Sequence, residues 1–465
     1  MIDLSIAVRN LLRNRRRSLA TFVALAVGTA SILLFGGFSA DIEASLQTVY
    51  VRTGGHLQIQ HRDYFLFGNG NPTAYGIRGY IKLIRAVGED ESLRRDVTVA
   101  TPTLQFGGIA GNYDAGVSRT VIGIGVVAAD HQRMRAWNDF GLPQTDPPFA
   151  LDGAASDAAI VGTGVARVLQ LCEALQLSSC PKRTEQPAAN GAALPADIAL
   201  LAGAEHPAAA TRGPAGWPKI ELLATNAGGT PNVVAVQVIK AEVQGFKELD
   251  EVFVMMQLPL AQRLVYGRSQ PEVTSILVQL EHSNRIDAAK RDLSALLASF
   301  APDQPLVVRD FRELNPFYVQ TIAMFDTIFG FIFVLIGVIV VFTVSSTMNT
   351  AVVERTVEIG TVRAIGLRRR GVERLFVLEG MMLGVAGAVS GALFALLAAA
   401  VVNRLGLTWL PPGSGGPLPL VLLVWKEKLM LVGTPLGLSL IATLSAWWPA
   451  HRASRLGIVD ALRHV

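Results

Sequence analysis

The chain has 465 residues, of which 51% are hydrophobic and only 17% are charged, and its mean hydropathy is +0.39. Soluble globular chains carry about 25% charged residues, so this composition disfavours an ordinary soluble enzyme. Seven His and two Cys exclude a cysteine-rich scaffold or an array of zinc ribbons. The length predicts two or more structural units.

Four apolar stretches are long enough to cross a bilayer as helices, which takes roughly 20 residues. They run over 18–40, 321–348, 375–402 and 429–448, and none has a charge in its central turns. The rival interpretation of the first stretch is a cleaved signal peptide. Its apolar run is too long for that, and Phe38 would stand at the −3 position of the cleavage site. We therefore expect an uncleaved anchor.

Arginines in the short flanking segments predict the orientation of the chain. Five lie at 9–17, six at 355–374 and three at 452–463, whereas 403–428 holds one Arg and two Lys. We therefore expect 1–17, 349–374 and 449–465 to face the cytoplasm, and 41–320 and 403–428 to face the other side. This bias accounts for the net charge of +4 without nucleic-acid binding.

The segment 41–320 predicts a large α+β domain inserted between the first and second membrane helices. Strand-like runs occur at 56–60, 97–104, 120–127, 233–243, 252–256, 274–280 and 305–311, with helices near 164–177 and from Ser283 onward. We expect a membrane-proximal lobe built from both ends of the segment and a distal lobe from about 120–245.

Cys172 and Cys180 are the only cysteines, and the predicted topology places them in an oxidising compartment. A local disulfide between them is the favoured interpretation. Metal binding is the alternative, but two thiolates rarely complete a site, and His206 stands at no zinc-motif spacing. No metal ligand is predicted.

Patterns that resemble catalytic motifs are incomplete in this sequence. A G-x-x-x-x-G-K-[ST] loop, which would cradle nucleotide phosphates, does not occur. Asp130-His131 could be half of a triad, although a surface pair is the simpler interpretation. Glu248, Asp250 and Glu251 are most simply a solvated turn, with a partner or cation contact as the alternative. No catalytic residue is predicted.

The segment 349–374 predicts an amphipathic helix where the second membrane helix leaves the bilayer. Glu354 and Glu358 lie one turn apart, and Arg355 can pair with Glu358 at i,i+3. Gly360 and Gly366 allow a close approach and a turn. Such a helix could transmit force from a soluble partner. The alternative is an interfacial linker that only anchors the orientation.

This segment resembles the cytoplasmic signature of FtsX-like ABC-transporter permeases, the type VII or MacB-like group. The matching residues are Glu354, Arg355, Glu358, Ile359, Gly360, Arg363, Ala364, Gly366, Glu379 and Gly380. The stretches 7–18 and 449–464 resemble the family's N-terminal helix and closing motif. More loosely, 159–171 and 243–265 look like parts of the LolC/LolE lipoprotein-releasing permeases.

The resemblance implies a non-catalytic permease subunit, without a cofactor of its own, in an inner (plasma) membrane. A separate cytoplasmic P-loop ATPase, carrying ATP and Mg²⁺, would dock on the 350–368 helix. Two permease chains, identical or different, would pair and move their periplasmic domains. The residues implied in coupling to the ATPase are Glu354, Arg355, Glu358, Ile359, Gly360, Arg363, Ala364 and Gly366.

Three roles remain open for such a permease. The first is release or export of hydrophobic cargo such as lipoproteins, with a periplasmic carrier. The others are MacB-like efflux with an adaptor and FtsX-like signalling to a cell-wall hydrolase. A membrane-anchored periplasmic enzyme is the competing class. Gly36, Gly37, Gly387 and Gly391 predict helix packing, with ordinary use of glycine in membrane helices as the alternative.

Overall fold

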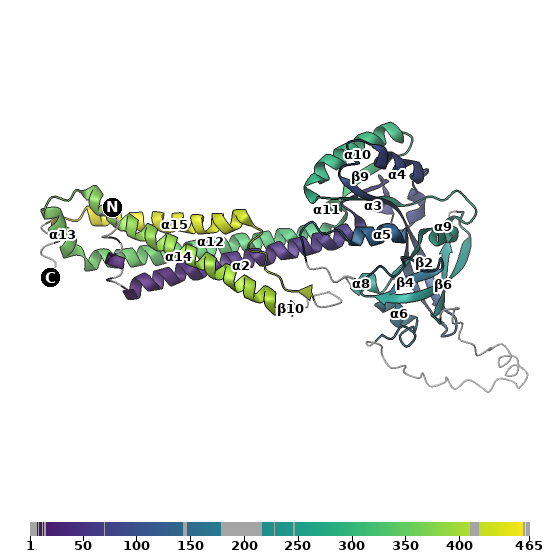
Figure 1. Cartoon of the computed structure of the whole chain (residues 1–465), viewed down its shortest axis with the longest axis horizontal. Coiled ribbons are helices and arrows are strands. Elements are labelled where there is room, and N and C mark those ends of the chain that lie inside the picture. The colour runs from purple at the N-terminus through teal and green to yellow at the C-terminus, as the bar shows by residue number, and fades with distance from the viewer. Residues whose placement is uncertain are drawn as a thin grey trace, which may run out of the picture. The chain divides into compact units, whose positions relative to one another are not determined.

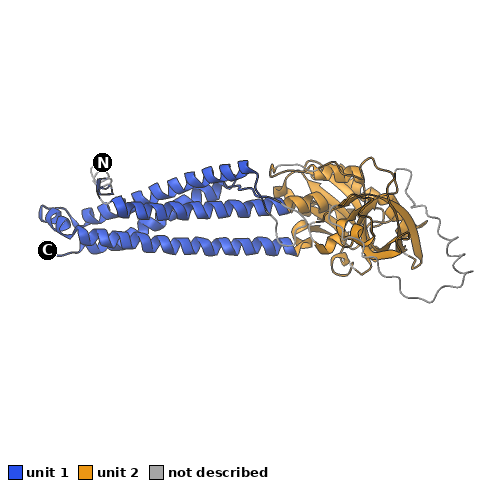
Figure 2. Ribbon diagram, turned by 90° about the horizontal axis from the view of Figure 1, so that it is seen from below, with its two compact units in different colours: residues 1–46, 317–409, 418–465 blue, residues 47–316, 410–417 orange. Residues whose placement is uncertain are grey.

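The computed structural model describes residues 7–461 apart from 8, 12, 14, 69, 143–146, 178–215, 227, 245–246, 410–417 and 459–460. The chain divides into two compact units (Figure 2). One, termed the membrane unit, comprises 1–46, 317–409 and 418–465. The other, termed the inserted unit, comprises 47–316 and 410–417.

Among the residues that the structure describes, four helices are long and apolar enough to cross a membrane, which supports the prediction of a membrane protein. They are α2 (Arg15–Gly54), α12 (Pro316–Glu354), α14 (Arg369–Leu405) and α15 (Lys428–Ser454). Local signals set their ends. Proline suits the first turn of α12, whereas α2 and α14 end at Gly55 and Gly406, whose positive φ favours glycine.

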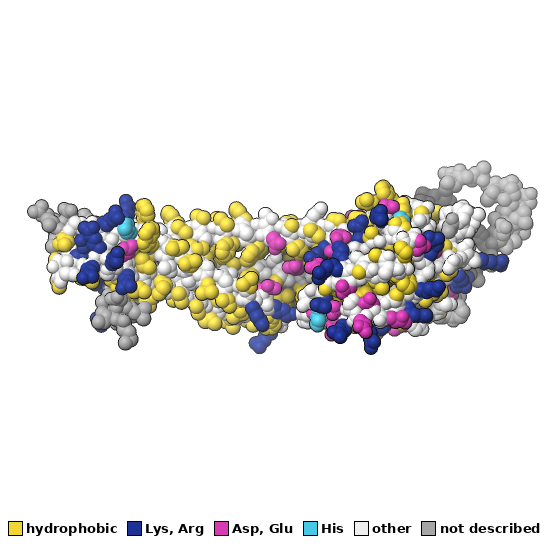
Figure 3. Space-filling model, turned by 90° about the horizontal axis from the view of Figure 1, so that it is seen from above, with side chains coloured by type: hydrophobic (Ala, Val, Ile, Leu, Met, Phe, Trp, Pro, Cys, Tyr) yellow, Lys and Arg dark blue, Asp and Glu magenta, His cyan; other side chains and the backbone are white. Residues whose placement is uncertain are grey.

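The membrane unit has the surface expected of a lipid-embedded bundle. Hydrophobic side chains cover most of its visible face, and Lys and Arg gather at the end that holds α13 (Thr356–Ala364) (Figures 1 and 3). Phe331 and Phe342 on α12 and Leu440 on α15 are among the exposed apolar side chains. In water such a surface would be unfavourable, so lipid or another chain must cover it.

Helix α14 packs against two neighbours through four glycines. A Cβ atom added at Gly384 would lie 2.9 Å from the Ala442 Cβ of α15, and one at Gly387 would lie 2.6 Å from the Leu25 Cβ of α2. Gly380 meets Ala446 of α15 in the same way, and Gly391 meets the Ala26 carbonyl of α2. Small residues therefore let the helix backbones approach closely, as is common in membranes.

Helices α2 and α12 are joined along their length. Near one end, the hydroxyl oxygens of Thr21 and Thr347 lie 2.7 Å apart. Further along, the rings of Phe35 and Phe329 stack with centroids 6.3 Å apart. The loop before α15 also contacts α2 at Gly37. The Leu423 amide donates a hydrogen bond to the Gly37 carbonyl at 3.0 Å, and a Cβ atom added at Gly37 would lie 2.6 Å from Val424 Cγ2. Gly36 similarly faces Met430.

The inserted unit is an α+β domain (Figure 1). Its strands are β1 (Leu57–His61), β2 (Val97–Asn112), β3 (Val117–Val126), β4 (Ala158–Gly162), β5 (Lys219–Thr225), β6 (Pro231–Glu242), β7 (Phe253–Gln257), β8 (Ser275–Leu280) and β9 (Leu306–Asp310). Its helices are α3 (Tyr64–Phe67), α4 (Tyr80–Glu89), α5 (Ala128–Arg135), α6 (Thr163–Val168), α8 (Lys247–Asp250), α9 (Leu258–Tyr266), α10 (Ile286–Phe300) and α11 (Phe311–Leu314), with short 3-10 turns at Pro72–Tyr75 and Ser283–Arg285. In the membrane unit, β10 (Thr408–Trp409) pairs with β11 (Leu418–Pro419).

One long strand, β2, connects the two parts of the sheet. The strand order is β3-β7-β4-β6-β5-β2-β8-β1-β9, and β3 also pairs with β2. The strands β2, β3, β7, β4, β6 and β5 therefore form a closed ring, whereas β8, β1 and β9 extend β2 as an open sheet. Buried side chains such as Leu104, Val236 and Met256 fill the core. The assignment of two lobes remains a prediction.

Two local expectations for the inserted unit are wrong. The helix expected near 164–177 ends at Val168, and Gln170 takes a positive φ of 54° that stops it. Asp250 is buried rather than solvated. Its carboxylate accepts hydrogen bonds from the Thr163 amide and the Gly164 amide, each at 2.8 Å. The acidic turn is therefore bound to the first turn of α6 by these hydrogen bonds.

The glycine packing of α14 is testable with Gly387→Ala. The added methyl group meets Leu25 at 2.6 Å, so we expect a loss of roughly 1–3 kcal/mol in unfolding free energy. Gly437→Ala on α15 is the matched control, because no described atom lies within 4 Å of its added Cβ. Thermal unfolding of the detergent-solubilised chain measures both variants. Equal stability of the two would contradict the packing.

Candidate functional site

The stretch expected to form one helix over 350–368 is divided by the structure. Helix α12 ends at Glu354, α13 spans Thr356–Ala364, and α14 begins at Arg369. Arg355 stands at the first break, and Gly366 makes the second turn with a φ of +110°, which only glycine adopts readily. The Arg355 side chain at this break is turned inward and buried.

Arg355 forms a buried ion pair with Glu379 of α14. Its Nη1 atom lies 2.9 Å from Glu379 Oε1, and the two side chains are only 9% and 2% exposed. The Asn10 side chain donates to the same carboxylate oxygen at 2.6 Å, and Arg355 Nη2 donates to the Asn10 carbonyl at 3.2 Å. A cavity of about 20 Å³, room for one water molecule, adjoins the pair. The N-terminal segment, α12 and α14 therefore meet at one charge cluster.

The two carboxylates implied in coupling are bound within the chain. Arg17 lies 2.5 Å from Glu354, and Arg13 lies 2.8 Å from Glu358. The expected i,i+3 pair between Arg355 and Glu358 does not form, because Glu379 takes the arginine. All four side chains of the two pairs are about half exposed, so each pair alone contributes about 0–1 kcal/mol to stability.

Helix α13 has one buried side and one exposed side. Thr356, Ile359 and Gly360 are buried, and Arg363 donates to the Leu456 carbonyl near the C-terminus. The opposite side, with the turn that follows, exposes four large apolar residues, and Ile365 is 82% exposed. We term this the coupling surface; it consists of Val357, Val362, Ile365 and Leu367. Ala364 is also exposed.

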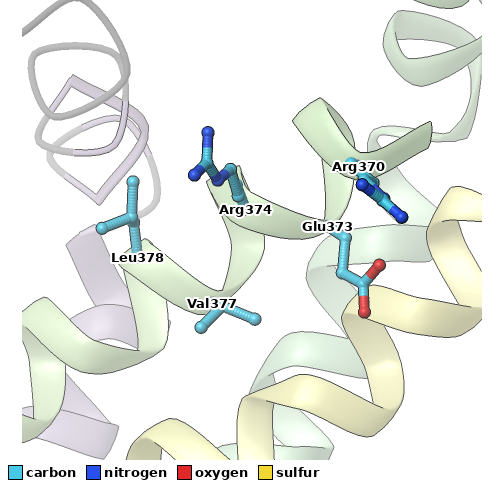
Figure 4. Close-up of a pocket in the computed structure, with 5 residues that line it drawn as sticks. All are labelled: Arg370, Glu373, Arg374, Val377 and Leu378. Carbon is cyan, nitrogen blue, oxygen red and sulfur yellow. The ribbon is translucent and has the colours of Figure 1, made fainter. Parts of the chain in front are cut away.

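An open cavity of about 600 Å³ lies beside the first turns of α14 (Figure 4). Arg370, Glu373, Arg374, Val377 and Leu378 line it. Glu373 points toward α15, where its carboxylate accepts a hydrogen bond from Trp447 Nε1 at 2.9 Å. Arg374 points the other way from Arg370 in this view, so the two guanidinium groups do not converge on one ligand.

A serine and a histidine of the inserted unit resemble a catalytic pair without its chemistry. His56 Nε2 lies 3.2 Å from Ser283 Oγ, but His56 Nδ1 accepts a hydrogen bond from the Leu280 amide at 3.0 Å. The proton therefore sits on Nε2, which cannot accept one from the serine. Burial lowers the pKa of His56 to about 4 and keeps the ring neutral. The pair is structural.

The other candidates of the inserted unit also have structural surroundings. Asp130 pairs with Arg133 at 2.6 Å, and His131 is buried against Phe149 rather than paired at the surface. Cys172 is disulfide-bonded, and Cys180 lies outside the described residues. No group of three or more His, Cys, Asp or Glu within the described residues is placed to hold a metal ion.

Sequence reasoning missed the partners of the charged residues. Glu379 enters the prediction only through the resemblance, although a carboxylate inside an apolar run is itself a signal of a paired charge. Asn10, Arg13 and Arg17 carry no such signal, since arginines near membrane helices are usual. The spacing Gly380-x-x-x-Gly384 was available as a packing motif and was not used.

Comparison with known proteins shows what parts of this chain are similar to. Residues 327–458 match the family model of the FtsX-like permease C-terminal domain. The lipoprotein-releasing system transmembrane protein LolC of Neisseria meningitidis is 27% identical over 258 residues, which cover 52% of this chain and 58% of LolC. LolC of Xylella fastidiosa strain 9a5c is 24% identical over 232 residues, covering 47% and 53%.

A second kind of relative is named as a combined ATP-binding and permease protein. The macrolide export ATP-binding/permease protein MacB of Chlorobium luteolum is 26% identical over 234 residues, covering 48% of this chain and 32% of MacB. The chain spans about half the length of the LolC relatives it matches. It therefore carries an FtsX-like permease domain and is a homologue of LolC and MacB ABC permeases at modest identity.

The buried pair predicts strong destabilisation when one partner is lost. Arg355→Met leaves the Glu379 carboxylate buried with only Asn10, and we expect a loss of about 3–5 kcal/mol in unfolding free energy. Glu379→Met in the same chain should recover much of this loss, because no charge is then left unpaired. Thermal unfolding in detergent measures both. A double variant no more stable than Arg355→Met would contradict the pairing.

The inserted unit should lose stability in mild acid. Burial lowers the pKa of His131 to about 4, and its Nε2 has no hydrogen-bond partner among the described residues. The unfolded chain takes up this proton near pH 6.5, so stability is present above that pH and falls toward pH 4, on the order of 1 kcal/mol per pH unit. His131→Phe should reduce the slope of the thermal unfolding midpoint against pH between 7.5 and 5 by about half, and His56, whose pKa burial also lowers to about 4, accounts for the slope that remains. An unchanged slope would contradict the assignment.

Proposed function

We propose that this chain is the permease subunit of an ABC transporter whose ATPase is a separate chain that docks on the coupling surface. ATP and Mg²⁺ belong to that partner. The N-terminal segment, α13 and the C-terminal segment face the cytoplasm, and the inserted unit faces the periplasm from an inner membrane. The Arg bias of the flanking segments supports this orientation.

The observation that carries the proposal is the apolar coupling surface at the charged end of the membrane unit. Four large apolar side chains stand exposed on one short helix and its turn, beside Arg368, Arg369 and Arg370. Contiguous exposed apolar residues mark interaction sites. The neighbouring arginines favour a partner whose contact surface is apolar at its centre and acidic at its rim.

ATP-driven movement of α13 would reach the inserted unit through the membrane helices. In the chain, α2 leads into the inserted unit and α12 leads out of it, and contacts between these two helices run along their length. Two permease chains would pair, which would also cover part of the exposed α12 surface. Mechanical transmission of this kind needs no charged pathway through the bilayer.

Release of lipoproteins or export of another hydrophobic cargo is the first candidate for the transported substrate, with a periplasmic lipoprotein carrier as a further partner. The printed names of the LolC relatives support it. MacB-like efflux through a periplasmic adaptor is the second candidate, supported by the MacB relative. FtsX-like signalling to a cell-wall hydrolase is the third, and the FtsX-like domain match supports it.

Docking is tested by purifying the detergent-solubilised chain from its native membrane and identifying bound chains by mass spectrometry. A P-loop ATPase should be present with the unaltered chain. Ile365→Glu should lose it, because a charge replaces the most exposed apolar residue of the coupling surface. Leu405→Glu at the opposite end of α14, where Leu405 is 64% exposed, is the matched control and should retain it.

The same experiment separates the candidate roles. A lipoprotein, an adaptor or a hydrolase among the bound chains would choose among the three. Glu358→Lys should reduce the amount of bound ATPase without abolishing it, since it places a lysine beside Arg13 at the start of α13 and loosens that helix. If no ATPase is bound by the unaltered chain, the transporter proposal fails.

A further inference from the structure

We propose that three N-terminal residues, Asn10, Arg13 and Arg17, form a strap that positions α13, so that motion of α13 is delivered to α2 as well as to α12. The inference rests on the proposed function, because it concerns how the same site works. It assigns a positioning role to residues that the sequence analysis uses only as an orientation signal and as part of the resemblance of 7–18.

Each member of the strap binds a different element. Arg13 binds Glu358 in the first turn of α13 at 2.8 Å. Arg17, on the first turns of α2, binds Glu354 at the end of α12 at 2.5 Å. Asn10 donates to Glu379 of α14 at 2.6 Å. The N-terminal segment therefore connects to every element that adjoins α13 in the chain, and to α13 itself.

Covalent connections alone would leave α13 able to pivot. It is linked to α12 through the break at Arg355 and to α14 through the glycine turn at Gly366. The buried side of α13 and the Arg363–Leu456 hydrogen bond hold its inner face. The Arg13–Glu358 pair adds an attachment at its exposed side. Leu11 packs against the apolar core that contains Phe376 and Val372, which holds the segment between its polar contacts.

In the chain, α2 precedes the inserted unit and α12 follows it. A displacement of α13 would act on α12 through the chain and on α2 through Arg13 and Arg17. The two helices are already joined by the Thr21–Thr347 contact. In this arrangement Glu358 serves the ATPase through Arg13 rather than by touching it, so Arg13 is a positioning residue and not a docking residue.

Hydrogen–deuterium exchange of the purified chain tests the strap without an ATPase. Arg13→Glu places two carboxylates together and should accelerate exchange of the α13 amides, on the order of fivefold, because an exposed ion pair changes an opening equilibrium about twofold to fivefold. The swapped chain, Arg13→Glu with Glu358→Arg, should return to the unaltered exchange rate. Arg16→Glu is the matched control, since Arg16 is exposed and makes no ion pair with a described residue.

A second measurement tests whether motion of α13 is transmitted to α2 and α12. The same variants are purified with the ATPase, and ATP turnover is measured per bound ATPase. Arg13→Glu should lower it about fivefold, the swap should restore it, and Arg16→Glu should leave it unchanged. Exchange in Arg13→Glu equal to that in Arg16→Glu overturns the strap. Turnover that stays low in the swapped chain also overturns it, because Glu358 would then contact the ATPase directly.

The exchange and turnover measurements distinguish failure of the strap from failure of the transporter proposal. An unaltered chain that binds no ATPase refutes the transporter proposal, and with it the delivery of motion, while the exchange measurement still decides whether the strap positions α13. An ATPase that binds and turns over normally in every variant leaves the transporter proposal standing and refutes the strap.

Discussion

The membrane unit depends on the need to pair one carboxylate, that of Glu379, away from water. Burying an unpaired charge costs several kcal/mol, so Glu379 requires a cation and further donors. Arg355 supplies the cation and Asn10 the donor. Arg355 stands between the end of α12 and the start of α13, so this buried pair fixes the point at which the two helices separate.

Packing of the remaining helices follows from small residues rather than from charge. Gly380 and Gly384 bring α14 against α15, and Gly387 and Gly391 bring it against α2. Helix α12 contacts α2 through aromatic and hydroxyl side chains and leaves much of its surface exposed. The bundle therefore has a closely packed side around α14 and an open side along α12, which suits a subunit that pairs with a second chain.

The residues of the inserted unit that resemble catalytic groups have structural roles. Its serine–histidine contact has the wrong tautomer for general-base catalysis, and its acidic turn is used to fix α6 through Asp250. A closed ring of strands shares β2 with an open sheet, so one strand connects both parts of the unit.

The sequence by itself determined the four apolar helices and the inserted α+β domain, because hydrophobic length and local periodicity are properties of neighbouring residues. Only the tertiary structure decided which charges pair. Asn10 and Glu379 are 369 positions apart, and Arg355 and Glu379 are 24 apart, beyond any helical spacing. The local rule favoured Arg355 with Glu358, but a glutamate in a buried apolar environment gains more from the arginine than an exposed glutamate does. The partner of Arg355 therefore depends on burial, which is known only once the helices have packed.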